Sequence, residues 1–202
     1  ASRIAAEGVA KVAVDGNTAV VVEVNSETDF VAKNEVFQDF VQDVANKALT
    51  VDTEKAGDGE DVCSILDMKA ELDEKTLKIG EKLSIRRFQK VTGDCVASYI
   101  HGGGRIGVLI EAETDVVNDE IKNALKNVAM QVAAMYPKYV SRDEVSQEYM
   151  DHEKEILLAA AKKENEESKK PKPDNIIEKM IIGRLNKELK EICLLDQTYV
   201  QD

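Results

Sequence analysis

The sequence contains two copies of one pattern, and this repeat restricts the possible fold more than any other feature. Residues 5–31 (AAEGVAKVAVDGNTAVVVEVNSETDFV) and 95–117 (CVASYIHGGGRIGVLIEAETDVV) each show an alternating strand, a glycine-containing turn, an apolar strand and Glu-Thr-Asp. An amphipathic helical pattern follows each copy. The repeat therefore predicts an α+β fold with two related subdomains, each a small antiparallel sheet packed with helices.

The first copy predicts an N-terminal subdomain over residues 1–92. Asp15-Gly16 lies between two strand patterns and is a strong hairpin signal. The return strand, 18–24, is an almost continuous apolar run, which is typical of a central strand. The remaining predicted elements are a helix over about 34–49, a surface loop at 51–61, one or two short helices within 63–77, and a third strand near 83–88.

The second copy predicts a C-terminal subdomain over residues 93–140. It has a hairpin around three glycines (102–104) and a helix over about 118–135, which Pro137 ends. No closing strand equivalent to that of the first subdomain is evident before residue 202. The chain also begins at Ala1 without Met. We therefore expect this subdomain to be incomplete and the sequence to be part of a longer protein.

Residues 141–193 predict a protruding antiparallel helical hairpin, a coiled coil, followed by a return segment at 194–202. Ser141 and Glu144 fit a capping box, and Pro171 and Pro173 mark the turn between the helices. At about 1.5 Å per residue, each helix would be roughly 30–40 Å long. The stripes expected to face each other are Val145, Tyr149, His152, Ile156 and Ala159 or Ala160 in the first helix, and Ile177, Ile181, Leu185, Leu189 and Ile192 in the second.

The composition favours a protein that contacts other proteins or a solvated enzyme. The formal net charge is −12, which argues against a nucleic-acid groove because phosphate binding needs clustered Lys and Arg. Cys63, Cys95 and Cys193 have no zinc-site spacing, and we interpret them as buried reduced thiols. No apolar run has the roughly 20 residues that a membrane-spanning helix needs.

The Glu-Thr-Asp segments are the first candidates for chemistry. Glu27 and Asp29 could be acid groups for metal binding or acid–base work, but no histidine or second carboxylate cluster stands beside them in sequence. Thr28 can cap a helix, either as its whole role or together with a partner contact. Phe30 fits the buried face of the following helix or an exposed position; its replacement by Val116 in the second copy leaves both interpretations open.

The two histidines have different predicted environments. His152 falls on the hairpin stripe, where we expect it to be packed. His101 precedes the three glycines of a turn, where a side chain is exposed. The glycines lack a following helix and a Gly-Lys-Ser/Thr sequence, so they do not predict a phosphate loop. No Ser/His/Asp or Cys/His set can be assembled.

Several segments together resemble the elongation factor Ts family, the guanine-nucleotide exchange factors of elongation factor Tu. The most specific is Glu-Thr-Asp-Phe-Val at 27–31, and the match covers essentially the whole chain. The other segments are 3–8 (RIAAEG), 98–102 (SYIHG), 105–109 (RIGVL), 178–180 (EKM) and 183–184 (GR). The resemblance implies two related αβ subdomains and a protruding coiled coil.

The resemblance also implies roles for individual residues. Thr28, Asp29, Phe30 and Val31 would approach the partner's nucleotide domain, where the phenyl ring wedges between helices and disturbs the Mg²⁺ and phosphate site. His101 would touch another partner domain, and the Ile79-Gly80 segment would make a further contact. Such a factor needs no catalytic side chain, cofactor or metal of its own, because it acts by binding the nucleotide-free partner more tightly.

Members of this family carry an N-terminal helical module before the position of Ala1 and complete the second subdomain after that of Asp202. The resemblance thus implies a fragment, from a bacterial cytoplasm or an organelle, with no direct contact to nucleic acid or membrane and with no oligomeric state set by the sequence. Two alternatives stay open: a non-exchange adaptor that docks through the helical hairpin, and a metal-dependent enzyme that uses Glu27 and Asp29.

Overall fold

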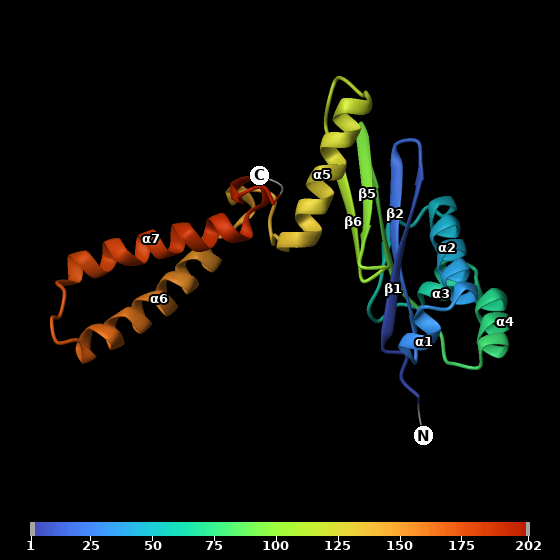
Figure 1. Cartoon of the computed structure of the whole chain (residues 1–202), viewed down its shortest axis with the longest axis horizontal. Helices are drawn as coiled ribbons and strands as arrows, with labels where there is room; N and C mark the ends of the chain where they lie inside the picture. The colour runs from blue at the N-terminus through green and yellow to red at the C-terminus, as the bar shows by residue number, and fades with distance from the viewer. Residues whose placement is uncertain (1–2, 201–202) are drawn as a thin grey trace. The chain divides into compact units, whose positions relative to one another are not determined.

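A computed structural model describes residues 3–200 and divides the chain into two compact units, Ala1–Ala133 and Ala134–Asp202. Two antiparallel sheets pack against helices, so the predicted α+β class is confirmed (Figure 1). The strands are β1 (Glu7–Asp15), β2 (Thr18–Ser26), β3 (Lys55–Ala56), β4 (Ser84–Thr92), β5 (Cys95–His101) and β6 (Ile106–Ala112). The α-helices are α1 (Asp29–Ala32), α2 (Glu35–Thr50), α3 (Val62–Ile65), α4 (Lys69–Ile79), α5 (Asp119–Met135), α6 (Gln147–Glu167) and α7 (Asp174–Ile192).

The larger sheet has the strand order β1-β2-β4-β3. Its apolar strand β2 is central, as predicted, and β4 closes the sheet against β2. Asp15 pairs with Thr18, so the turn has two central residues, and the first of them, Gly16, has φ 59°. The predicted hairpin is therefore confirmed, with Gly16 and Asn17 as its central residues, and the positive φ at the first of them favours glycine.

Helix α2 covers one face of this sheet and forms the main core with β2 (Figure 1). Asn34 caps the helix by accepting a 2.8 Å hydrogen bond from the amide of Val36. The apolar spacing then turns one stripe inward, and each large apolar side chain buried here contributes roughly 1.5–3 kcal/mol. The fully buried members of this core include Phe37, Phe40, Val41 and Val44 of α2, and Val20, Val22 and Val24 of β2.

The β5–β6 hairpin packs against strands β1 and β2. Close approach depends on glycine: a Cβ atom on Gly107 would lie 2.6 Å from Cγ2 of Val21 and 3.2 Å from Cβ of Ala10. Helix α5 then packs on the hairpin through a small cluster that includes Val108 and Ala129. Helix α5 of the second repeat therefore forms a separate layer on the β5–β6 hairpin.

In the second unit, α6 and α7 form an antiparallel pair (Figure 1). The start of the pair differs from the prediction. Residues Arg142–Glu144 form a single 3-10 turn, and the Ser141 side chain makes no capping bond. Instead, Ser146 Oγ accepts a 3.0 Å hydrogen bond from the amide of Tyr149, so α6 begins five residues later than the predicted cap.

The predicted contact face of α6 is wrong in part: Tyr149 packs beside Leu189 of α7, as predicted, but the following positions of the stripe do not face α7. His152 is exposed and Ile156 is 49% exposed, whereas Ala161 packs with Ile177 and Ile181 of α7. The face toward α7 follows the four-residue series 149, 153, 157 and 161, which contains a glutamate. Because of this glutamate, the spacing of apolar residues alone predicts a stripe on the neighbouring face.

The cysteines are unpaired in the structure: Cys95 and Cys193 are buried and Cys63 is half-buried. Burial raises the pKa of the Cys63 and Cys193 thiols. Raised pKa values disfavour the reactive thiolate form. Among residues 3–200, no helix is sufficiently long and apolar to cross a bilayer.

Candidate functional site

The candidate site is the short helix α1, which displays Phe30. The ring is 82% exposed, so the structure supports the exposed position and not a place in the core of α2. The single helical turn explains this orientation: Ala32 is buried and Val31 packs against the core, so Phe30 on the opposite side faces solvent. An exposed phenylalanine on an ordered turn is a surface feature that a partner can bury.

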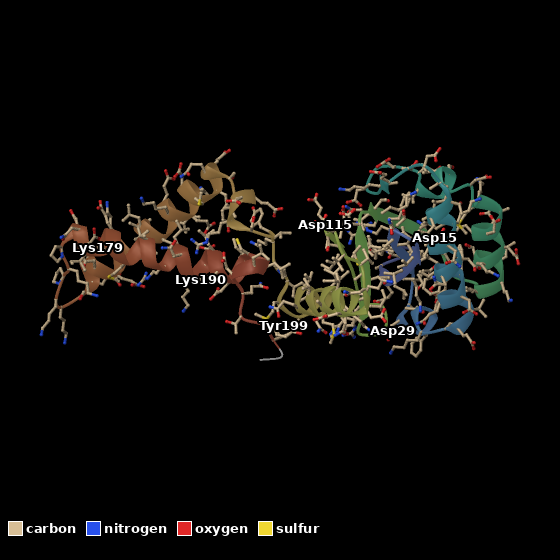
Figure 2. The ribbon with its side chains drawn as sticks, turned by 90° about the horizontal axis from the view of Figure 1, so that it is seen from above. Asp15, Asp29, Asp115, Lys179, Lys190 and Tyr199 are labelled. Carbon is tan, nitrogen blue, oxygen red and sulfur yellow. The ribbon has the colours of Figure 1, made fainter. Side chains whose placement is uncertain are left out.

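Asp29 places a carboxylate beside this ring. Its Oδ2 atom lies 3.9 Å from Nζ of Lys33, and both side chains are more than half exposed. Exposed i,i+4 pairs contribute only about 0.3–0.5 kcal/mol, so this pair can separate easily when a partner binds. Figure 2 labels Asp29 and Asp115, the equivalent positions of the two repeats.

Thr28 caps helix α1 and is also bound by the carboxylate of Glu81. Its hydroxyl oxygen accepts a 3.3 Å hydrogen bond from the amide of Val31. The same hydroxyl donates a 2.7 Å hydrogen bond to Oε2 of Glu81, and the Thr28 amide donates a 3.1 Å bond to Oε1 of Glu81. The predicted capping role of Thr28 is therefore confirmed, and its polar groups are used within the chain.

Glu27 and Glu81 form a reciprocal pair of contacts, which we call the Glu27–Glu81 bracket. Glu81 Oε1 accepts the amide of Glu27 at 3.2 Å, and Glu27 Oε1 accepts the amide of Lys82 at 2.7 Å. Arg3 lies 3.9 Å from the same Glu27 oxygen. The bracket ties the start of α1 to the chain just after α4.

This bracket brings two of the predicted contact segments together. Ile79 ends α4, and Gly80 caps the helix in the left-handed conformation with φ 81°. Leu77, one turn earlier, is 85% exposed. Leu77 and Gly80 border a shallow hollow of about 450 Å³ that also includes Glu27 and Glu81. Sequence reasoning missed Glu81, because its contacts are with residues more than 50 positions away.

His101 belongs to a different part of the first unit. It ends β5, is exposed as predicted, and its Nδ1 lies 3.0 Å from the hydroxyl of Tyr99. The following glycines all have positive φ values, which lets the chain turn sharply after the histidine. No hydrogen bond among the described residues joins His101 to the Glu27–Glu81 bracket.

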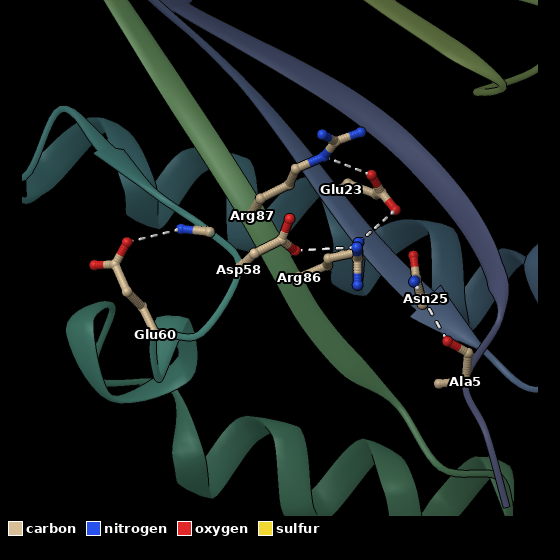
Figure 3. A network of polar contacts seen from close by, with 8 residues as sticks. Ala5, Glu23, Asn25, Asp58, Glu60, Arg86 and Arg87 are labelled. Carbon is tan, nitrogen blue, oxygen red and sulfur yellow. Dashed lines mark hydrogen bonds and ion pairs between the residues drawn. The ribbon is translucent and has the colours of Figure 1, made fainter.

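The Arg86-Arg87 pair is already engaged by acidic side chains (Figure 3). Arg87 Nε donates a 2.8 Å hydrogen bond to Glu23, and an Arg86 guanidinium nitrogen lies 3.0 Å from Asp58. The Arg87 side chain borders a hollow of about 700 Å³ that also includes Arg105. The arginine pair is therefore locally neutralised and does not present a free phosphate-binding surface.

No group of three or more His, Cys, Asp or Glu side chains that could hold a metal ion occurs within residues 3–200. The Glu27 carboxylate, proposed above as a possible acid group, accepts a backbone amide in the bracket. The arrangement described so far offers an exposed apolar ring on a fixed turn, with a second exposed surface at His101. Such features suit the recognition of another protein.

Comparison with known proteins decides the family. The family model described as Elongation factor TS matches residues 27–202. The chain belongs to the elongation factor Ts family. Elongation factor Ts of Clostridioides difficile (strain 630) is 52% identical over 207 residues, an alignment that covers 100% of this chain and 66% of that relative. The resemblance seen in the sequence is thus confirmed, and the chain spans just under two thirds of this elongation factor Ts.

Proposed function

We propose that this chain is a guanine-nucleotide exchange factor that binds elongation factor Tu in its GDP-bound form and promotes GDP release during translation elongation. Membership of the elongation factor Ts family supports this function. The observation that carries it is the 82% exposure of Phe30 in the Thr-Asp-Phe-Val segment. The factor acts by binding, with no covalent step, and its place of action is the cytoplasm, most simply that of a bacterium.

Phe30 is the residue that opens the partner's nucleotide site. Its ring enters a space between helices of the nucleotide domain, and Asp29 and Val31 contact the rim of that space. Displacement of those helices disturbs the Mg²⁺ ion and the phosphate loop, which lowers the affinity for GDP. Burial of the ring contributes roughly 1.5–3 kcal/mol, and only the part of it realised in the nucleotide-free state drives release.

Two further contacts hold the partner while Phe30 acts. Ile79 and Gly80 lie on the chain segment that the Glu27–Glu81 bracket joins to α1, so they contact the partner near the same domain. His101 contacts another domain. Binding at two separated places raises the effective concentration of each contact for the other, so moderate individual contacts suffice.

The rate of GDP release tests this function. Elongation factor Tu loaded with a fluorescent GDP analogue is mixed with the chain and excess unlabelled GDP. Wild-type chain should accelerate release, and Phe30→Ala should reduce the acceleration by about 10- to 100-fold, as expected for a loss of 1.5–3 kcal/mol. Val116→Ala, at the equivalent position of the second repeat, is the matched control. An unchanged rate with Phe30→Ala would refute the role of this ring.

The helical hairpin supports a second candidate function, a non-exchange adaptor. Ile156 of α6 and Ile182 of α7 are 49% and 50% exposed, so the hairpin has apolar side chains available for docking. In the adaptor hypothesis, deletion of residues 150–192 abolishes partner binding and the release rate is never accelerated. The exchange hypothesis expects the deletion to leave a weaker but measurable acceleration.

A further inference from the structure

We propose that Glu81 is the positioning residue for Phe30, acting through Thr28 to fix the short helix on which the ring is displayed. This inference rests on the exchange function proposed above and adds to it the device that holds the ring. It assigns the Glu27–Glu81 bracket a role in partner recognition. It is supported by hydrogen bonds, by the exposure of the ring and by an internal comparison of the two repeats.

A chain of hydrogen bonds that begins at Glu81 ends next to Phe30. One carboxylate, that of Glu81, accepts bonds from the amides of Glu27 and Thr28 and from the hydroxyl of Thr28, at 3.2, 3.1 and 2.7 Å. The oxygen of that hydroxyl then accepts the amide of Val31. The chain of contacts spans the residues on both sides of Phe30.

The Phe30 ring itself contributes little to its own placement. At 82% exposure, Phe30 has almost no packing that could fix the orientation of α1. A four-residue helix is too short to be stable alone, because nucleation is unfavourable. Its geometry must therefore come from its caps and from the neighbouring Val31 and Ala32. Bonds to a charged carboxylate are the strongest of these polar contacts.

The second repeat has the same sequence pattern but lacks this arrangement of hydrogen bonds. The amide of Thr114 donates to Oδ2 of Asp94 at 3.1 Å, but its hydroxyl donates to the carbonyl oxygen of Val116. Residues 113–118 form no helix, and α5 begins only at Asp119. The short helix therefore occurs in the repeat in which one carboxylate accepts bonds from both the amide and the hydroxyl of the threonine. It does not occur in the repeat in which the carboxylate accepts only the amide.

A fixed position of α1 favours recognition of the partner. A side chain that is ordered before binding loses less conformational entropy when the partner closes around it. The reciprocal bond from the amide of Lys82 to Glu27 also fixes the position of Gly80 relative to α1. The bracket thus holds two contact segments, distant in sequence, in one arrangement before the partner arrives.

The test combines a measurement on the free chain with the release assay. In the free chain, hydrogen exchange at the amides of Glu27, Thr28 and Val31 should become at least about tenfold faster in Glu81→Ala, because removing a capping acceptor exposes these donors. The amide of Val22 in the central strand should be unaffected. Glu74→Ala, at an exposed position on helix α4, which precedes Glu81, is the matched control and should behave as wild type.

In the release assay, Glu81→Ala should lower the acceleration about tenfold in the wild-type background and cause no further loss in a Phe30→Ala background. That loss of additivity identifies action through Phe30. Glu81→Gln keeps one oxygen acceptor and should restore part of the activity. Thr28→Val removes only the hydroxyl contacts, and provides the same test if Glu81→Ala folds poorly.

Each outcome bears on the inference. Unchanged amide protection in both Glu81→Ala and Thr28→Val would overturn it. If Phe30→Ala does slow release, lost protection in Glu81→Ala with unchanged nucleotide release would overturn it as well. Additive losses in the double variant would also overturn it, because Glu81 would then act independently of Phe30. If Phe30→Ala alone has no effect on release, the proposed function fails, while Glu81-dependent protection of Thr28 and Val31 would still support its positioning of α1.

Discussion

The amide of Ala10 donates a 2.7 Å hydrogen bond to the carbonyl oxygen of Gly104, and this bond joins the first repeat to the second. Ala10 lies on β1, whereas Gly104 belongs to the turn that follows His101. The contact places the turn against the larger sheet. It gives the surface around His101 a fixed position relative to the sheet that supports α1.

Gly104→Ala is therefore expected to destabilise the first unit. Gly104 has φ +105°, and an added Cβ would lie 3.0 Å from Val9 and 3.2 Å from the carbonyl oxygen of Ala10. Such backbone strain costs on the order of 1–3 kcal/mol. Gly57→Ala, which would make only an ordinary 3.4 Å contact, is the control. Denaturant unfolding followed by circular dichroism measures the difference; equal stability of the two variants would contradict this packing.

Phe30 and Phe37 should respond in opposite ways to truncation. Phe37 is fully buried, so Phe37→Ala should lower the free energy of unfolding by about 3–5 kcal/mol. Phe30 is 82% exposed, so Phe30→Ala should leave that free energy within about 0.5 kcal/mol of wild type. Chemical denaturation of both variants gives the comparison. A large loss with Phe30→Ala would show that the ring supports the fold itself.

The beginning of α6 offers a direct comparison of two serines. Ser146 Oγ caps α6, so Ser146→Ala should destabilise the second unit by about 0.5–2 kcal/mol. Ser141 makes no capping bond with its side chain, so Ser141→Ala should have little effect. Thermal unfolding of the two variants distinguishes the structure from the capping box predicted by sequence, which expects the reverse order.

Glu188 should make the stability of the second unit depend on pH. Burial, a hydrogen bond with Glu153 and the charge of Glu153 raise the pKa of its carboxyl above the usual 4.5. The folded chain therefore holds this proton more tightly than the unfolded chain. This contribution to the free energy of unfolding is therefore present below the usual pKa and is lost as pH rises through the raised pKa of the folded chain.

Glu188→Gln removes that titration and should reduce the fall in melting temperature between about pH 4 and pH 7. The hydroxyl of Tyr149, which donates to Glu188 at 3.3 Å, keeps an oxygen acceptor in this variant. Glu191→Gln, at an exposed position of α7, is the control for a simple change of net charge. Identical pH profiles for wild type and Glu188→Gln would exclude the contribution of Glu188.

The sequence predicted those parts of the fold that depend on local pattern. The Asp15-Gly16 turn, the central strand β2 and the positions of α2 and α5 all follow from spacing within a few residues. The contact face of α6 could not be found in this way, because a glutamate, Glu153, lies on the side that faces α7. The face of α6 that packs against α7 is therefore determined by the residues of α7 opposite it, and not by local hydrophobicity alone.

In the candidate site, too, local sequence pattern predicts some features, whereas others depend on tertiary contacts. Exposure of Phe30 was one of two open interpretations, and only the packing of Val31 and Ala32 decided between them. Glu81 could not be found from sequence, because its role exists only after folding brings residues 27–28 beside it. The proposed partner contacts at Ile79, Gly80 and His101 remain predictions.

The most direct test of the central claim compares the affinity of the chain for nucleotide-free and for GDP-bound elongation factor Tu, measured by titration calorimetry. By linkage, a factor that weakens GDP binding must itself bind the nucleotide-free form more tightly, by the same ratio. We expect Phe30→Ala to reduce this ratio by about 10- to 100-fold, mainly by weakening binding to the nucleotide-free form. If Phe30→Ala weakens binding to both forms equally, the ring is only an anchor and does not open the nucleotide site.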